Sequence, residues 1–476
     1  MKQYCYTTLL CLLLALWIKP AAAQQPSTLD YYCQPGTGPF FNRFTDVPIL
    51  IDTLDSITAV RNILYREAQP WDSATLQKLY MDIYFPDTTV DPLLKRPFIL
   101  LMFGGGFING DRSMMKGYCQ EFAKRGFVAA TIDYRLGKDI DTPCRNKLTN
   151  LPEPYSEEKA QYRAIQDADS ALRYIISRAS TYRINKNWIF AGGFSAGAGI
   201  ANGLVYVSQD EANNSAPGPV TLEMELGKLR GTTHNYTIKG IFSNWGGIGY
   251  SFYDAAEAVP TVAFHGTNDK VVPCYLDKKY NDKVPACGQN DSILGSGGLA
   301  AALQAAGKCY DVTLFQGAGH GIWPDNTPNA IKRKALTFRV DRAACFFKSL
   351  MCDGIPCIST NPPLLVASED KLDTLAWPYA HCYPNPGTIN SSWPDRKNDL
   401  QIHPNPASGY FKINGGTLTD PLTVSLYDNT GRQVRSYKQA ETGKRLGTAQ
   451  LAPGLYLVII RNANNTLLTR KKLVIQ

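Results

Sequence analysis

Long apolar runs are scarce in this 476-residue sequence. The densest run covers residues 9–18, and roughly ten residues are too few to span the ~30 Å hydrocarbon layer of a membrane. Lys2 precedes this run, and Pro20 and three alanines follow it, which is typical of a secretory signal peptide rather than a membrane helix. We therefore predict a signal peptide at residues 1–23, no transmembrane segment, and an exported chain that starts at Gln24.

The sequence also lacks a CxxC pair, which argues against a zinc site and against a thioredoxin-like redox centre. Ten of the twelve cysteines follow the predicted signal peptide. An even number of cysteines in an oxidising compartment favours disulfide bonds, although the sequence does not assign their pairing. Cys274 and Cys287 bracket one loop and are the first pair to consider. We expect no metal and no cofactor.

Net positive charge is missing from most of the chain, although the whole sequence carries +8. Residues 400–476 carry +7 and the predicted signal peptide carries +2, which leaves residues 24–399 at −1. A nearly neutral region of this length has no electrostatic footprint for a polyanion. We therefore expect no nucleic-acid partner.

Strand and helix patterns alternate from about residue 76. Such an alternation predicts an α/β fold with a doubly wound, mostly parallel sheet, in which functional groups follow the carboxyl ends of the strands. The predicted strands are Leu76–Phe85, Phe98–Phe103, Phe127–Asp133, Trp188–Ala191, Ile238–Phe242, Thr261–Phe264 and Val312–Phe315. The predicted helices are Gly117–Arg125, Glu157–Ser180 and Ala198–Tyr206.

Composition divides the mature chain into three parts. Residues 24–355 form the predicted α/β domain, residues 356–399 are rich in Pro, Asn and Ser and read as a linker, and residues 400–476 show short alternating strands typical of a small β-sandwich. Two polar stretches of the α/β domain, residues 137–155 and 209–235, interrupt its pattern. They are either a lid over the site or plain surface loops.

A serine lies between a predicted strand and a predicted helix. The sequence Gly193-Phe194-Ser195-Ala196-Gly197 has the G-x-S-x-G pattern of a nucleophile elbow, in which the turn is too tight for side chains beside the serine. Ser195 is therefore the candidate nucleophile, and the helix that follows offers the amide of Ala196 to a developing oxyanion.

A serine nucleophile needs a histidine base, and the chain has only five histidines. His320 lies in a glycine-rich loop after the last predicted strand, so it is the candidate base. Asp269 follows the strand before it and is the candidate acid, with Asp254 and Glu257 as competitors that precede that strand. The alternatives are that His320 is an ordinary surface residue and that Asp269 is an ordinary turn residue.

Three glycines, Gly104 to Gly106, follow the predicted strand at residues 98–103. Their backbone amides can approach a substrate oxygen closely, as an oxyanion hole requires. The alternative is an ordinary tight turn.

These motifs together resemble those of α/β-hydrolase carboxylesterases, notably the hormone-sensitive-lipase and the bacterial feruloyl and acetyl-xylan esterase branches. The resemblance covers about residues 76–350 and rests on five stretches in order: residues 104–107, 133–136, 193–197, 265–269 and 319–321. It implies that Gly105, Gly106 and Ala196 form the oxyanion hole. Those families usually have His before the three glycines, whereas this chain has Phe103, so the loop must be anchored differently.

The last 77 residues resemble type IX secretion sorting domains. The stretches that carry this resemblance are residues 403–409, 426–432, 451–456 and 471–476. It implies that the type IX secretion machinery is a partner, and that the protein is carried across the outer membrane of a gram-negative bacterium to the cell surface or the medium.

The sequence thus predicts a secreted serine carboxylic ester hydrolase that works through an acyl-enzyme. By family likeness, its substrates would be esters of short-chain or aromatic acids, either small molecules or decorations of polysaccharides. A serine peptidase of the same fold and an inactive surface-binding protein are the alternatives.

Overall fold

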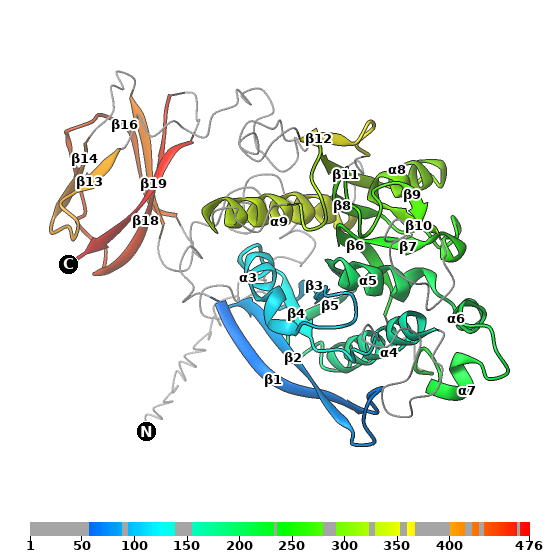
Figure 1. Cartoon of the computed structure of the whole chain (residues 1–476). Coiled ribbons are helices and arrows are strands. Elements are labelled where there is room, and N and C mark those ends of the chain that lie inside the picture. Colours follow the sequence, from blue (N-terminus) through cyan, green and yellow to red (C-terminus); the bar gives the residue numbers. More distant parts are fainter. Residues whose placement is uncertain are drawn as a thin grey trace, which may run out of the picture.

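A nine-stranded sheet organises the larger part of the computed structural model (Figure 1). Its strand order is β1-β2-β4-β3-β5-β6-β8-β11-β12. The bounds are β1 (Ile57–Ala68), β2 (Gln77–Pro86), β3 (Arg96–Met102), β4 (Val128–Ile132), β5 (Ile184–Phe194), β6 (Ile238–Asn244), β8 (Thr261–Gly266), β11 (Tyr310–Phe315) and β12 (Leu364–Val366). β1 and β2 pair antiparallel to their neighbours, and the strands from β4 to β12 run parallel. The predicted α/β class is confirmed.

The structure describes only part of the chain. The described residues are 57–87, 94–138, 155–232, 236–278, 292–322, 329–352, 359–366, 400–414, 421–427, 433–463 and 467–476. The predicted signal peptide and most of the predicted linker lie outside them. No helix within these ranges is long and apolar enough to cross a membrane.

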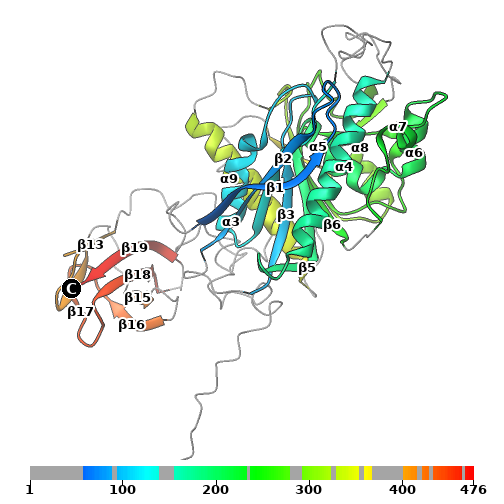
Figure 2. The same ribbon diagram turned by 90° about the horizontal axis from the view of Figure 1, so that it is seen from below.

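Helices cover both faces of the sheet. Figure 2 shows α3 (Lys116–Lys124) and α9 (Asn329–Met351) on one face, and α4 (Ser156–Ser177), α5 (Ala196–Tyr206) and α8 (Ser296–Ala305) on the other. All seven residues of β3 are buried, as expected for a central parallel strand with a continuous apolar sequence. The core of this part is one hydrophobic cluster of strand and helix residues.

Apart from β12, three elements of the sheet and its cover have no counterpart in the predictions. β1 is an edge strand with many exposed positions, so it lacks a clear alternation. The long helix α9 buries three basic residues, Arg339, Arg342 and Lys348, which obscure its apolar side in the sequence. The apolar residues of α8 are mostly alanines flanked by glycines, a composition that does not distinguish helix from loop.

The segment predicted as a linker contributes to the sheet. β12 lies within residues 356–399 and pairs parallel with β11, from Thr313–Leu364 to Phe315–Val366. Thr360 extends this contact, because its hydroxyl accepts the amide of Val312 at 3.0 Å. The linker prediction is therefore wrong for residues 364–366: a strand of three residues is too short to produce a periodic signal.

The polar stretch at residues 209–235 forms two short helices, α6 (Gln209–Ser215) and α7 (Leu222–Leu226). A capping box of Ser208 and Glu211 starts α6, which explains its polar composition. Tyr162 on α4 donates a hydrogen bond to the carbonyl of Gly227 at 2.6 Å, so this stretch is fastened to α4. Residues 139–154 of the other polar stretch lie outside the described residues.

Cys274 is a free, buried thiol, so the proposed pairing with Cys287 is wrong. The side chain belongs to the main hydrophobic cluster, and burial raises the pKa of Cys274 to about 11. Flanking loop composition could not reveal that this residue packs inward. Cys119 on α3 is also free and buried.

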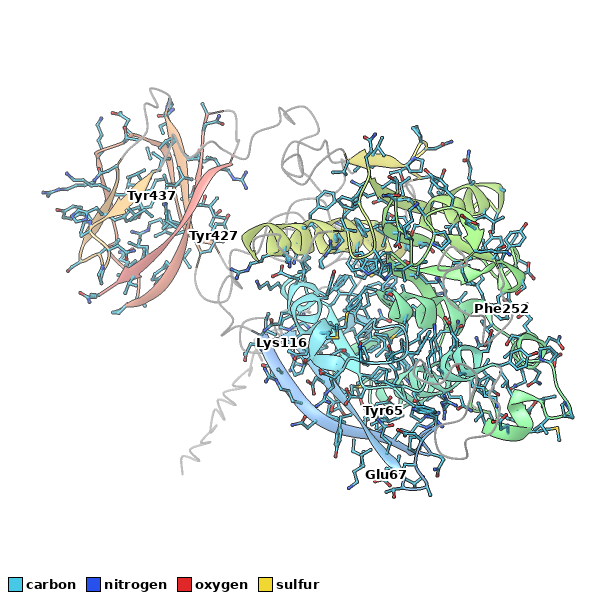
Figure 3. All side chains as sticks on the ribbon, in the orientation of Figure 1. Tyr65, Glu67, Lys116, Phe252, Tyr427 and Tyr437 are labelled. Carbon is cyan, nitrogen blue, oxygen red and sulfur yellow. The ribbon has the colours of Figure 1, made fainter. Side chains whose placement is uncertain are left out.

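A small β-sandwich forms the C-terminal part of the chain. One sheet has the order β13-β14-β17 and the other β16-β15-β18-β19. Their bounds are β13 (Gln401–His403), β14 (Tyr410–Asn414), β15 (Leu422–Tyr427), β16 (Gln433–Ala440), β17 (Arg445–Gly447), β18 (Gly454–Arg461) and β19 (Leu467–Ile475). The two sheets share their own hydrophobic cluster, and Tyr437, labelled in Figure 3, packs edge-on against Phe411 with ring centroids 5.9 Å apart.

Candidate active site

Ser195 occupies the sharp turn between β5 and α5. Its backbone has φ 52° and ψ −123°, a conformation that side-chain-bearing residues rarely adopt. Its amide donates a hydrogen bond of 2.9 Å to the carbonyl of Asn244 at the end of β6. The Asn244 side chain donates a second bond, of 3.1 Å, to the carbonyl of Gly193. Asn244 therefore holds both sides of the turn, a role that no sequence pattern indicated.

The two glycines of the G-x-S-x-G pattern are required by close backbone contacts. A Cβ atom at Gly193 would lie 2.3 Å from the carbonyl oxygen of Met102, and one at Gly197 would lie 2.1 Å from the same oxygen. Both distances are far below van der Waals contact, so β3 and the turn pack backbone against backbone. This packing places Ser195 above the carboxyl end of the sheet.

The structure brings Ser195, His320 and Asp269 together in one hydrogen-bonded chain. His320 Nε2 lies 2.8 Å from Ser195 Oγ, and His320 Nδ1 lies 2.8 Å from Asp269 Oδ2. The Asp269 side chain is fully buried, whereas the His320 side chain is 24% exposed. The imidazole can thus meet water, while the carboxylate is shielded from it.

The loops that carry Asp269 and His320 follow neighbouring parallel strands. β8 and β11 pair up to Gly266 and Phe315. Beyond that point the amide of Asn268 donates to the carbonyl of Ala318 at 2.9 Å. The two loops are therefore bonded to each other, and Asp269, rather than Asp254 or Glu257, faces His320.

The Asp269 carboxylate is ionised despite its burial. Burial by itself raises the pKa of Asp269, but hydrogen bonds from His265 and His320 and from the backbone amide of Val271 hold the pKa well below its usual range. An ionised acid in this position fixes the His320 tautomer that carries a proton on Nδ1 and leaves Nε2 free to accept one.

Of the remaining histidines, the structure describes His265 and His403, and neither is hydrogen-bonded to Ser195. His265 is completely buried at the end of β8, and His403 is in the sandwich strand β13. His234 and His381 lie outside the described residues. Within the described ranges, no group of three or more His, Cys, Asp or Glu side chains is placed to hold a metal ion.

The glycine-rich loop after β3 presents free amides beside the serine turn. Gly105 and Gly106 have φ 117° and 62°, so both depend on the conformational freedom of glycine. Their amides, and that of Ala196 at the start of α5, donate no hydrogen bond to any described residue. A Cβ atom at Gly104 would lie 2.6 Å from the Phe194 ring, which shows how closely the loop approaches the turn.

Tyr134 anchors this loop at Phe103, the position at which the resemblance described above led us to expect histidine. Its hydroxyl donates to the carbonyl of Phe103 at 2.9 Å, and its ring stacks on the Phe103 ring with centroids 4.2 Å apart. The amides of Gly137 and Lys138 also donate to the carbonyl of Phe107, at 2.8 and 3.1 Å. The segment after β4 thus holds both ends of the loop.

The segment after β4 is in turn fixed by charged groups. Asp133 accepts the amide of Arg112 at 3.1 Å and forms an ion pair with its guanidinium. Tyr65 on β1, labelled in Figure 3, donates to the carbonyl of Asp133 at 2.5 Å. Arg135 forms a buried ion pair of 2.9 Å with Asp167 on α4. The sequence marked residues 133–136 as a motif, but it did not reveal this anchoring role.

Comparison with known proteins agrees with this architecture. Residues 81–149 and 154–249 match the family described as BD-FAE, a range that includes Ser195 and the glycine-rich loop but ends before Asp269. Residues 401–476 match the secretion system C-terminal sorting domain.

Individual relatives are more distant. A stretch of 139 residues is 30% identical to methylphloroacetophenone synthase of Cladonia uncialis, and it covers 29% of this chain and 5% of that protein. This chain therefore spans about a twentieth of that relative's length. Thermogutta terrifontis esterase 2 phosphorylated by paraoxon aligns with a TM-score of 0.38 and 19% identity, over 60% of this chain and 92% of its own. The butyrate-bound form aligns with a TM-score of 0.37 and 20% identity, over 58% and 92%.

A mostly parallel sheet that carries a serine on a strained turn defines the α/β-hydrolase class. Within that class, the chain carries an esterase-like domain of the BD-FAE type, followed by a secretion system C-terminal sorting domain. The resemblances inferred from the motifs are confirmed for both parts.

The strained backbone at Ser195 predicts an unusual order of stability. Ser195→Gly and Ser195→Ala both lose the bond to His320, but only glycine relieves the strain, which costs on the order of 1–3 kcal/mol. We expect the glycine variant to be more stable by about 1 kcal/mol, since the more flexible unfolded chain offsets part of the gain. Urea denaturation of the two variants measures the difference.

The same pair of substitutions at Ser170, inside α4, is the matched control. There alanine should be the more stable by about 1 kcal/mol, because glycine disfavours a helix. If Ser195→Ala proves as stable as Ser195→Gly, the turn is not strained.

Proposed function

We propose that this protein is a secreted serine carboxylic ester hydrolase in which Ser195 is the nucleophile, His320 the general base and Asp269 the acid. One observation carries the proposal: the unbroken hydrogen-bonded chain from Ser195 Oγ through His320 to the buried Asp269 carboxylate. A serine hydroxyl becomes a strong nucleophile only when a positioned base takes its proton.

In the acylation step, Ser195 Oγ attacks the ester carbonyl carbon while its proton moves to His320 Nε2. The negative charge that develops on the carbonyl oxygen is stabilised by the amides of Gly105, Gly106 and Ala196. The tetrahedral intermediate then collapses, and the departing alcohol takes the proton from His320. Asp269 stabilises the imidazolium that exists between these two transfers.

In the deacylation step, water replaces the alcohol. His320 Nε2 removes a proton from the water as it attacks the acyl carbon, and the same amides stabilise the second oxyanion. The collapse of this intermediate returns the proton to Ser195 Oγ and releases the carboxylic acid. The partial exposure of His320 is consistent with water reaching the base.

The substrates we propose are esters of short-chain or aromatic acids, such as those that decorate polysaccharides. Support comes from the esterase-like domain and from the C-terminal sorting domain, because an exported esterase meets polymers outside the cell. The substrate class is inferred by analogy with the family.

The sorting domain indicates export to the cell surface or the extracellular space. We propose that the type IX machinery is the partner that recognises it and that the predicted signal peptide directs the first step of export. Disulfide bonds in the exported protein are also proposed. In support, Cys309, Cys345 and Cys352 are not among the free cysteines of the described residues, which are Cys119 and Cys274.

A fluorophosphonate probe tests the nucleophile directly. We expect one covalent label on the wild-type protein, located at Ser195 by peptide mass spectrometry, because such probes react only with activated serines. Ser195→Ala should abolish labelling, and Ser113→Ala, on the 3-10 helix η2 (Arg112–Met115), should leave it intact. Labelling that survives Ser195→Ala would overturn the assignment, and a folded wild type without labelling would favour the inactive binding protein.

A substrate panel separates the esterase from a serine peptidase. We expect turnover of acetyl, butyryl and feruloyl esters and none of peptide substrates, with kcat reduced on the order of 10⁴-fold or more in Ser195→Ala. Turnover of peptides without turnover of esters would establish the peptidase alternative.

The hydrogen bond from Tyr134 to the glycine-rich loop after β3 predicts that a variant without it loses kcat but keeps its KM. Tyr134→Phe removes the hydroxyl that holds the Phe103 carbonyl but keeps the ring stacking. Because the free amides act on charge that develops in the transition state, kcat should fall by about tenfold while KM changes by less than about twofold. Steady-state ester hydrolysis measures both. Tyr84→Phe, at a buried tyrosine of β2, is the control and should keep wild-type kcat. If Tyr134→Phe and Tyr84→Phe have equal kcat, Tyr134 does not anchor the loop.

A further inference from the structure

His265 lies beside Asp269, the candidate acid, and both nitrogens of its ring have hydrogen-bond partners. Its Nε2 atom is 3.0 Å from the carbonyl oxygen of Val272 and 3.2 Å from Asp269 Oδ2. Its Nδ1 atom is 2.9 Å from Ser296 Oγ and 3.4 Å from the backbone nitrogen of Ser296. The side chain is fully buried, so water cannot replace these partners.

These partners determine the tautomer of His265. Nε2 faces two oxygen atoms that can only accept, so it carries the proton. Nδ1 faces the backbone N–H of Ser296, so it is the acceptor, and the Ser296 hydroxyl donates to it as well. The ring is therefore neutral, and its one N–H donates to the Val272 carbonyl and lies beside Asp269 Oδ2, 3.2 Å from Nε2. It cannot serve as the base, because the nitrogen that accepts is occupied by Ser296.

The Asp269 carboxylate consequently receives donors on both oxygens. Oδ1 accepts the amides of Val271 at 2.8 Å and Val272 at 3.0 Å. Oδ2 accepts a hydrogen bond from His320 Nδ1 at 2.8 Å, and His265 Nε2 lies 3.2 Å from it on the other side. The two amides belong to the loop that follows Asp269 itself. Among the described residues, His265 is the one side chain of β8 that lies against Oδ2.

We propose that His265, oriented by Ser296 at the start of α8, is a positioning residue for ester hydrolysis: its Nε2–H holds Asp269 Oδ2 in line with His320 Nδ1. This proposal rests on the function proposed above. The alternative is that His265 only fills space in the core, in which case any side chain of similar size that folds would serve equally well. If His265 is a positioning residue, a hydrogen-bond donor at the Nε2 position contributes to kcat; if it only fills space, the donor contributes nothing.

Two substitutions with opposite donor properties test the proposal in the full-length chain. His265→Leu keeps a bulky side chain but removes the donor, and we expect kcat for ester hydrolysis to fall by about 10–100-fold with KM within about twofold, because a small displacement of the acid misaligns the base. His265→Gln restores an N–H near the Nε2 position and should recover kcat to within about tenfold of wild type. His403→Leu and His403→Gln, on the exposed β13 residue, are the matched controls and should not change kcat.

A second measurement does not depend on activity. The proton between His320 Nδ1 and Asp269 should give a low-field NMR resonance that disappears in His320→Gln. We expect this resonance to shift or broaden in His265→Leu and to return in His265→Gln. Ser296→Ala keeps the imidazole but removes the hydroxyl that orients it, so it should reduce kcat by a smaller factor than His265→Leu does. This variant also tests the proposal if His265→Leu fails to fold.

The outcomes separate the two proposals. If wild type hydrolyses no ester but the resonance responds to His265→Leu, the proposed reaction is wrong and the positioning role stands. If folded His265→Leu keeps kcat within about twofold of wild type and an unchanged resonance, His265 is a space-filling residue and the positioning role is wrong. Equal losses in His265→Leu and His265→Gln would likewise overturn it, because the donor would then make no contribution.

Discussion

The burial of one ionised carboxylate governs the arrangement of this site. Removing Asp269 from water carries a large desolvation cost, which only hydrogen-bond donors in the interior can offset. The fold supplies them from three places: the end of β8 through His265, the following loop through Val271 and Val272, and the loop after β11 through His320. The same bonds that make the charge tolerable fix the direction in which His320 points. Stability and geometry of the site therefore have one physical origin.

Backbone contacts, rather than side chains, shape the other half of the site. The serine turn presses against β3 at Gly193 and Gly197, and the glycine-rich loop presses against the turn at Gly104. Side chains would prevent this approach, so the glycines are needed where they lie. The strain at Ser195 is held by neighbouring elements, as expected when the surrounding structure determines a conformation the residue would not choose.

The two parts of the chain differ in charge as well as in fold. Ten Lys and Arg residues fall within residues 400–476, while residues 24–399 are nearly neutral. Each part has its own hydrophobic cluster, so neither depends on the other to bury its apolar residues. This separation suits a chain whose last part serves export and whose larger part serves chemistry.

The sequence by itself determined the α/β class, most strands of the sheet, the serine turn and the sorting domain, because periodicity and short motifs are local properties. It missed β1, α8, α9 and β12, where edge exposure, an alanine- and glycine-rich composition, buried cations or shortness remove the periodic signal. It proposed Asp269 and His320 from their order along the chain, but left Asp254 and Glu257 open. Only the tertiary structure decided which carboxylate meets the imidazole, since 51 residues separate Asp269 from His320 and 125 separate His320 from Ser195. Tyr134 contacts Phe103 because β3 and β4 are paired, an adjacency that no local pattern records. His265 is only four residues from Asp269, but its position also depends on Ser296, which lies 31 residues further along the chain.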